Sequence, residues 1–148
     1  MSEHPDLKRI ALAKYTDNDL EYVHATDEEN VFDADRGVYL VLDDEEADQA
    51  VREYVWESLW AFNIDFILNE TGIDYDDNMR DSLRDTLSTS CERANGLLQA
   101  LIAGTCGFDR FVRDAIITDG RGHFLSLYDG EEGEQAVDGK TFYIYRRD

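Results

Sequence analysis

The stretch Gly37-Val-Tyr-Leu-Val-Leu-Asp-Asp-Glu-Glu46 decides the fold, because an apolar run changes abruptly into a run of carboxylates. Residues 37–42 are short, β-branched and aromatic, which predicts a buried strand. Asp43 or Asp44 can then cap a helix, and Glu45 and Glu46 fall in its first turn, where the helix dipole favours negative charge. The sequence therefore predicts a buried strand that leads directly into a helix.

Three helices are predicted after this stretch. The first carries an apolar side chain at every third or fourth position, and Gly72 suits its left-handed end. The second, residues 83–101, repeats that spacing, and the third, residues 108–118, stops before Gly120. The apolar face of the first helix consists of Val51, Val55, Leu59, Phe62 and Phe66.

Strands are predicted at both ends of the chain. Residues 7–15 predict a first strand, although their pattern also permits a short helix, and residues 26–30 predict a loop. After Gly122 the periodicity changes to two, so residues 123–128 and 141–145 predict an aromatic-rich hairpin, with Asp-Gly turn dipeptides between them. The predicted fold class is α+β, a small antiparallel sheet of N-terminal strands plus the C-terminal hairpin, packed against about three helices.

Length and composition indicate a single domain spanning residues 1–148. The apolar fraction of 43% is too high for a disordered chain. No apolar run reaches the roughly 18 residues of a membrane span, and the first residues lack the basic and apolar parts of a secretory signal. We therefore expect a cytoplasmic protein with no membrane partner.

Negative charge is the strongest signal in the sequence. The formal net charge is −20, from 34 acidic and 14 basic side chains, and the excess is steepest in residues 1–50, with 15 acids against 4 bases. Such a chain repels phosphate backbones. We expect no direct binding to nucleic acid, and instead a protein partner with a basic surface.

Three interpretations of this charge stay open. Solubility is the first, but a net charge of magnitude about 2–8 already serves a small domain. Adaptation to high salt is the second, since lysine occurs only at positions 8, 14 and 140. The third is imitation of DNA, in which carboxylates take the places of phosphates that lie about every 1.7 Å along a duplex.

The expected partner-binding surface comprises four acidic patches, within residues 27–29, 43–48, 74–77 and 131–134. A charge run is also typical of a face that is merely solvated, and this alternative stays open for each patch. The candidate residues are Asp27, Glu28, Glu29, Asp43, Asp44, Glu45, Glu46, Asp48, Asp74, Asp76, Asp77, Glu131, Glu132 and Glu134.

An alternative site is a pocket around Arg121 and His123, with Tyr128 and Asp129. His123 with an acid could supply a general base and its orienting group, and Arg121 could stabilise an anion. A regular strand would, however, place His123 and Tyr128 on opposite faces. The simpler interpretation is that Arg121 bonds to helix carbonyls or nearby acids and that Asp129 starts a turn, so we assign no catalytic residue.

No metal or cofactor is expected. The segment that begins at Asp74 resembles a calcium loop only at its first positions, because Met79 replaces the required glycine and Asp85 replaces the final glutamate. Three scattered histidines give no zinc pattern, and the chain has no nucleophile elbow or phosphate-binding glycine loop.

Three segments and the chain's end resemble a family of small hypothetical proteins of bacteriophages and mobile elements. They are Ala-Val-Arg-Glu-Tyr-Val-Trp-Glu-Ser-Leu-Trp-Ala-Phe-Asn (50–63), Cys-Glu-Arg-Ala-Asn (91–95), Asp-Gly-Arg-Gly-His-Phe-Leu-Ser-Leu-Tyr-Asp-Gly-Glu-Glu (119–132) and Tyr-Ile-Tyr-Arg (143–146). The resemblance covers roughly residues 40–148. That family has no assigned reaction, so the resemblance implies only an accessory protein acting in a bacterial host.

Charge and resemblance together predict a non-enzymatic protein that binds and inhibits a nucleic-acid-binding host defence protein, of the CRISPR or restriction type, through an acidic and DNA-mimicking surface. Two alternatives stay open: a small enzyme or ligand-binding protein that uses the pocket near Arg121 and His123, and a salt-adapted housekeeping domain. The sequence leaves the oligomeric state open.

Overall fold

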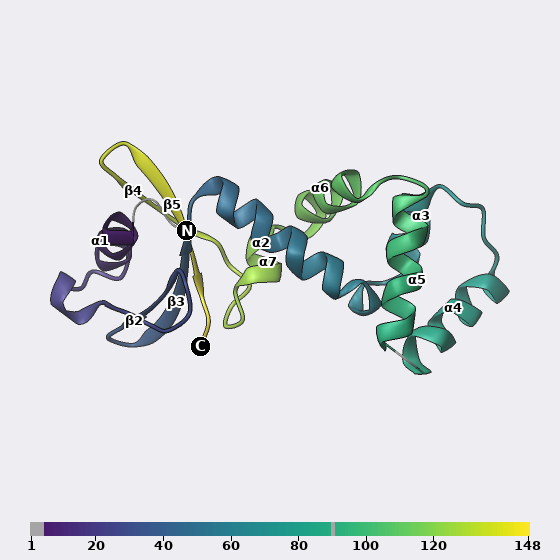
Figure 1. Cartoon of the computed structure of the whole chain (residues 1–148), viewed down its shortest axis with the longest axis horizontal. Coiled ribbons are helices and arrows are strands. Elements are labelled where there is room, and N and C mark those ends of the chain that lie inside the picture. Colours follow the sequence, from purple (N-terminus) through teal and green to yellow (C-terminus); the bar gives the residue numbers. More distant parts are fainter. Residues whose placement is uncertain (1–4, 90) are drawn as a thin grey trace. The chain divides into compact units, whose positions relative to one another are not determined.

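The computed structural model describes residues 5–89 and 91–148, in which two compact units are distinguished. The sheet unit comprises Met1–Val51 with Asp119–Asp148, and the helical unit comprises Arg52–Thr118. The described residues form five strands, seven α-helices and two short 3-10 helices (Figure 1). The α+β prediction is confirmed, but the number of helices is larger than the three expected. The single-domain expectation stays a prediction.

The sheet is antiparallel, with strand order β1-β2-β3-β5-β4. Its N-terminal strands meet the C-terminal hairpin where β3 pairs with β5, with Val41 opposite Ile144. Both residues of the hairpin turn, Asp138 (φ 51°) and Gly139 (φ 81°), are left-handed, as a two-residue turn of the favoured type requires. The strands are β1 (His24–Ala25), β2 (Val31–Ala34), β3 (Gly37–Leu42), β4 (Gly133–Val137) and β5 (Lys140–Arg146). The strand predicted from the opening stretch is therefore the central one.

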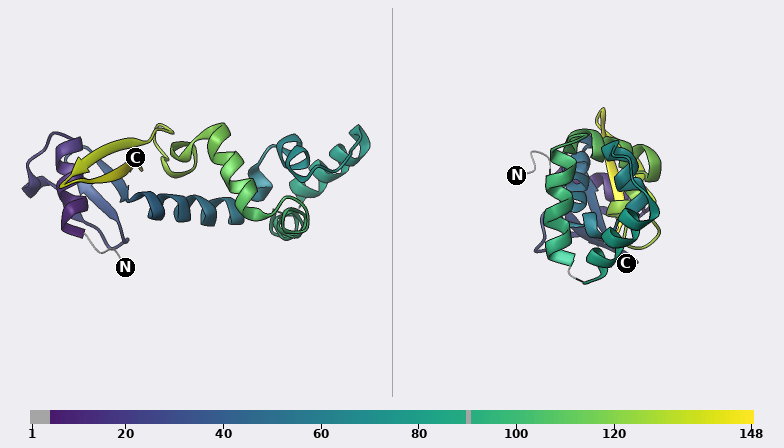
Figure 2. Two further views of the ribbon diagram at one scale, coloured as in Figure 1. Left: turned by 90° about the horizontal axis from the view of Figure 1, so that it is seen from above. Right: turned by 90° about the vertical axis from the view of Figure 1, so that its right-hand side faces the viewer.

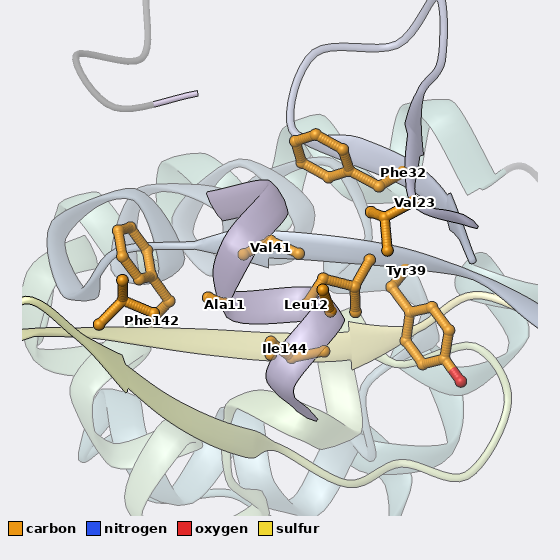
Figure 3. Packing of buried hydrophobic residues seen from close by; sticks show 10 residues of the cluster. Ala11, Leu12, Val23, Phe32, Tyr39, Val41, Phe142 and Ile144 are labelled. Atoms are coloured by element: carbon orange, nitrogen blue, oxygen red, sulfur yellow. The ribbon is translucent and has the colours of Figure 1, made fainter. Parts of the chain in front are cut away.

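Helix α1 (Pro5–Tyr15) covers one face of this sheet (Figure 2). Leu12 of α1 and Phe142 of β5 are fully buried there, and burial of each such side chain contributes about 2 kcal/mol. Figure 3 shows α1 lying over β3 and β5, with these side chains between them. The buried cluster consists of Ala11, Leu12, Ala13, Val23, Phe32, Tyr39, Val41, Val137, Phe142 and Ile144.

The opposite face of the sheet is covered by α7 (Arg121–Leu125) and the first turns of α2 (Asp44–Glu57). Because side chains alternate along a strand, Tyr143 and Tyr145 point away from the α1 side and toward α7. Phe124 and Leu125 of α7 are buried. This second face holds the polar cluster described below.

The helical unit contains the end of α2, η2 (Leu59–Ala61), α3 (Ile64–Thr71), α4 (Asp77–Thr89), α5 (Cys91–Ala103) and most of α6 (Phe108–Asp119). Its core is apolar and includes Leu59, Ile67, Leu98, Ile102 and Phe111, all fully buried. In contrast, none of the residues of α4 is buried. Helix α4 is therefore a surface helix of this unit.

The first predicted helix is interrupted after Glu57, although no glycine or proline follows there to end it. Asn95 of α5 explains the break, since it is buried and its amide donates to the Trp56 carbonyl at 2.9 Å. The same side chain accepts a hydrogen bond from the Trp60 backbone N–H at 3.1 Å. Asn95 thus satisfies the backbone groups freed where the helix stops.

Other predicted elements also differ from the structure. Residues 7–15 lie in a helix because their buried positions 8, 11 and 12 recur at helical spacing. Residues 121–125 are helical where a strand was expected at 123–128. Strand β4 lies where a loop was predicted, and its sequence did not indicate a strand because polar side chains are exposed at this edge of the sheet. The second predicted helix is two helices, α4 and α5, with residue 90 outside the described part. No helix in the described ranges is long and apolar enough to span a membrane.

Candidate functional site

The patch at residues 43–48 begins α2, and its acids form a capping box. The Glu46 N–H donates to the Asp43 carboxylate at 2.8 Å, and the Asp43 N–H donates to the Glu46 carboxylate at 3.0 Å. This reciprocal arrangement satisfies two backbone donors at the helix start. The two acids therefore have a local structural role.

Glu46 also neutralises a buried lysine. The Lys8 side chain comes from α1, is 1% exposed, and lies 2.6 Å from a Glu46 carboxylate oxygen. Its ammonium group also donates to the Asn30 side-chain oxygen at 2.7 Å. A buried ammonium is tolerated only when it is paired and hydrogen-bonded in this way. Sequence reasoning missed this cluster because the three residues are far apart in the chain.

Arg121 is the centre of a second cluster, on the sheet face opposite α1. Its side chain is only 10% exposed, and it donates to Glu132 at 2.8 Å, Asp44 at 2.9 Å and Asp48 at 3.1 Å. The guanidinium group also lies 4.5 Å from the centre of the Tyr143 ring, within cation–π range. Arg121 therefore pairs with three acids and one ring of its own chain.

The cluster also fixes the protonation of its members. Burial alone would lower the pKa of Arg121, but its hydrogen bonds to Glu132 and Asp44 and the surrounding negative charge raise it instead. Burial, followed by the hydrogen bond to Glu132, raises the pKa of Tyr145 well above its ordinary value. The Tyr145 phenol thus stays protonated and donates to Glu132. A permanent cation and a neutral phenol suit a structural role better than proton transfer.

The other residues of the alternative pocket have different surroundings. His123 is exposed and meets the edge of the Phe124 ring, and Tyr128 is exposed beneath the Arg146 guanidinium group at 4.1 Å. The Asp129 carboxylate accepts the Glu131 N–H at 3.0 Å and the Ser126 hydroxyl at 2.8 Å, and these two bonds, the first above all, hold the pKa of Asp129 below its ordinary value. Within the described ranges, no hydrogen bond or ion pair joins His123 to Arg121 or Asp129.

Several other candidate acids are also held by partners. Asp76 accepts the Met79 N–H at the start of α4, at 2.9 Å, and Asp77 lies 3.1 Å from Arg80. In contrast, the carboxylates of five other candidate acids form no ion pair and no hydrogen bond within the described residues. These acids are Asp27, Glu45, Asp74, Glu131 and Glu134. The acids of the four patches thus divide into structural ones and solvated ones.

The largest exposed acidic stretch runs from residue 17 to residue 35, here called the acidic segment. It carries eight acids and no lysine or arginine, and all eight side chains are exposed. Glu28 of this set forms an ion pair with Arg147 at 3.5 Å. Sequence reasoning identified the acids at 27–29 but missed Asp17, Asp19, Glu21, Asp33 and Asp35. The absence of lysine and arginine from residues 17–35 could have indicated them.

The charge is unequal between the two units. The sheet unit holds 22 acids and 8 bases, a net −14, and the helical unit holds 12 acids and 6 bases, a net −6. Despite this density of carboxylates, no group of three or more metal-ligating side chains in the described ranges is arranged to hold a metal ion. The sheet unit therefore carries most of the net negative charge of the chain.

The comparisons with known proteins add no assignment. A scan against protein-family models finds no match, and searches of the curated proteins and of the solved structures find none either.

Proposed function

We propose that this protein binds the basic surface of a nucleic-acid-binding host defence protein and blocks it. The observation that supports this proposal is the acidic segment, which carries eight exposed acids and no lysine or arginine. A surface of this kind accelerates encounter with a positively charged groove and repels nucleic acid itself. Imitation of a DNA strand is the form of inhibition that this charge favours.

Exposed apolar side chains lie within the acidic segment and would prolong binding. Tyr22 is 52% exposed, and Leu20 is exposed beside it on η1 (Leu20–Tyr22). Arg9 holds this turn against α1, since its guanidinium group donates to the carbonyls of Leu20 and Val23 at 2.8 and 2.6 Å. Aromatic anchors on a fixed backbone are typical of the few residues that dominate binding energy.

The alternative functions have less support. A catalytic pocket at Arg121 would need a free cation, whereas this guanidinium group is bonded to three carboxylates of its own chain. Salt adaptation makes a separate prediction, because screening of the repulsion within a −20 chain would raise the unfolding midpoint steeply between low and molar salt. A midpoint that is flat across this range would remove that interpretation.

The proposal is tested by capture of the partner. The tagged protein is incubated at moderate salt with lysate of a bacterium that carries restriction or CRISPR defences, and the retained proteins are identified. We expect one stoichiometric nucleic-acid-binding protein that added duplex DNA releases. Retention of nothing above background, or of proteins that DNA does not release, would contradict the proposal for that host.

The acidic segment is tested by a triple variant that removes charge but keeps shape, Asp17→Asn with Asp19→Asn and Glu21→Gln. Asp17 has a left-handed backbone (φ 55°), which asparagine tolerates. A loss of three exposed charge pairs weakens binding about ten-fold. The matched control, Glu57→Gln with Asp85→Asn and Glu92→Gln, removes the same charge from exposed positions of the helical unit and leaves capture unchanged.

A further inference from the structure

The helical unit contains an apolar pocket that the acidic segment does not involve. The pocket has a volume of about 410 Å³, within the range of about 300–1,000 Å³ that is usual for small-molecule sites. It lies between η2, the start of α3 and the second half of α4. Its walls are Trp60, Phe62, Asn63, Ile64, Arg84, Leu87 and Ser88.

The walls of this pocket are mainly apolar and partly open to solvent. Trp60 is 43% exposed although tryptophan is usually well covered, and Ile64 is buried at the pocket's base. Phe62 and Leu87 complete the apolar lining. A flat apolar ligand would remove this surface from water, which is favourable by roughly 25 cal/mol for each Å² covered.

The charged group of the pocket is a cation. None of the seven lining residues is acidic, in a chain of 34 acids, and one is arginine. The Arg84 side chain is 58% exposed, and its ion pair with Asp81 is at the 4.0 Å limit. It therefore keeps most of its donors for another group.

The two neutral polar residues differ in what they offer a ligand. The Asn63 side-chain oxygen accepts the Asp65 N–H at 2.8 Å, which leaves the amide nitrogen as a donor. The Ser88 hydroxyl donates its one hydrogen to the Asp85 carbonyl at 2.8 Å, which leaves its oxygen as an acceptor. A ligand of this pocket thus meets apolar walls, the Arg84 cation and the Asn63 amide donor.

From this combination we infer that the pocket binds small monocarboxylates with a flat apolar body of about two fused rings. The carboxylate accepts hydrogen bonds from Arg84, and the body lies between Trp60 and Leu87. This site belongs to the helical unit and does not depend on the proposed function, because none of its residues lies in the acidic segment.

Calorimetric titration with two test compounds of equal shape examines the inference. 2-Naphthoate carries the carboxylate, and 2-naphthylmethanol replaces it with a neutral alcohol. We expect naphthoate to bind about five-fold more tightly, the difference that one partly exposed charge pair supplies. Arg84→Gln removes that preference and leaves the affinity for the alcohol unchanged, whereas Trp60→Ala weakens both compounds.

Arg93→Gln is the matched control, because Arg93 is an exposed arginine of the same unit outside the pocket. It carries the same change in charge and leaves both affinities as they are. Equal binding of the two compounds, no binding of either, or an equal effect of Arg93→Gln and Arg84→Gln would each overturn the inference. Thermal unfolding of every variant separates a lost site from a lost fold. Sedimentation compares the wild type with Trp60→Ala, and a dimer that this substitution dissociates would also overturn the inference, because a second copy would then occupy the pocket.

Discussion

Replacement of Arg121 by methionine tests the polar cluster of the sheet unit. The change keeps an unbranched apolar side chain of similar length but removes the guanidinium group. Three carboxylates, from Asp44, Asp48 and Glu132, then lose their shared cation. The folded state becomes less stable because these like charges stay close together.

The magnitude follows from the exposure of each partner. Asp44 and Asp48 are well exposed, so each of their pairs contributes about 0.5 kcal/mol. The bond to Glu132 is less exposed and charge-assisted, and contributes about 1.5 kcal/mol. Contact with the Tyr143 ring adds about 0.5 kcal/mol. Arg121→Met therefore lowers the free energy of unfolding by about 3 kcal/mol.

Urea denaturation measures this loss as a lower midpoint at unchanged slope. Arg36→Met is the control, because Arg36 is an exposed arginine of the same unit whose side chain has no partner among the described residues, and its loss is below about 0.5 kcal/mol. If Arg121→Met were no more destabilising than Arg36→Met, the account of Arg121 as a structural cation would be refuted, and a free, ligand-binding arginine would be the better interpretation.

Three further changes test other parts of the structure. Gly122→Ala destabilises the chain by about 3 kcal/mol in urea, because its new methyl group would lie 2.6 Å from backbone atoms of the neighbouring loop, whereas Gly96→Ala, with open space around it, is neutral or stabilising. Asn95→Ala costs about 2 kcal/mol by the same measurement, since a buried backbone N–H and C=O lose their partner; a loss below 0.5 kcal/mol would show that the helix break does not need Asn95. The pKa of Asp129 is lowered by folding, so its stabilisation is present above the ordinary value of about 3.9 and is lost as the pH falls through the folded value. The stability difference between wild type and Asp129→Asn is therefore largest at neutral pH and disappears in acid, and a difference that persists in acid would contradict this.

Local sequence patterns predicted the elements that a continuous apolar run, a turn dipeptide or a single apolar helix face identifies. Residues 37–42 are a strand with both faces covered, so a continuous apolar run identified it. The hairpin turn at Asp138 and Gly139 was predictable because a two-residue turn needs two successive residues with left-handed backbones, and Asp-Gly is a dipeptide that favours this conformation. Helix α6 was predicted almost to its ends from one apolar face and a following glycine.

Tertiary contacts decided the elements that sequence patterns missed. Helix α2 stops where Asn95, almost forty residues later, donates to the carbonyl of Trp56 in its last turn. Strand β4 was missed because an edge strand with polar side chains on its open face lacks the apolar signal. The same limit applied to the candidate site: the sequence showed the acids at 43–48 but not that Lys8 and Arg121 neutralise several of them.

The most direct test of the proposed function is displacement of DNA from the captured partner. A fluorescent duplex bound to the purified partner is titrated with this protein, and the anisotropy of the duplex is followed. The proposal predicts that the wild type releases the duplex completely at a one-to-one ratio and that the triple variant at residues 17, 19 and 21 needs about ten-fold more protein. Anisotropy that stays constant while the two proteins form a complex would contradict binding in the DNA groove, and equal potency of wild type and triple variant would contradict the role of the acidic segment.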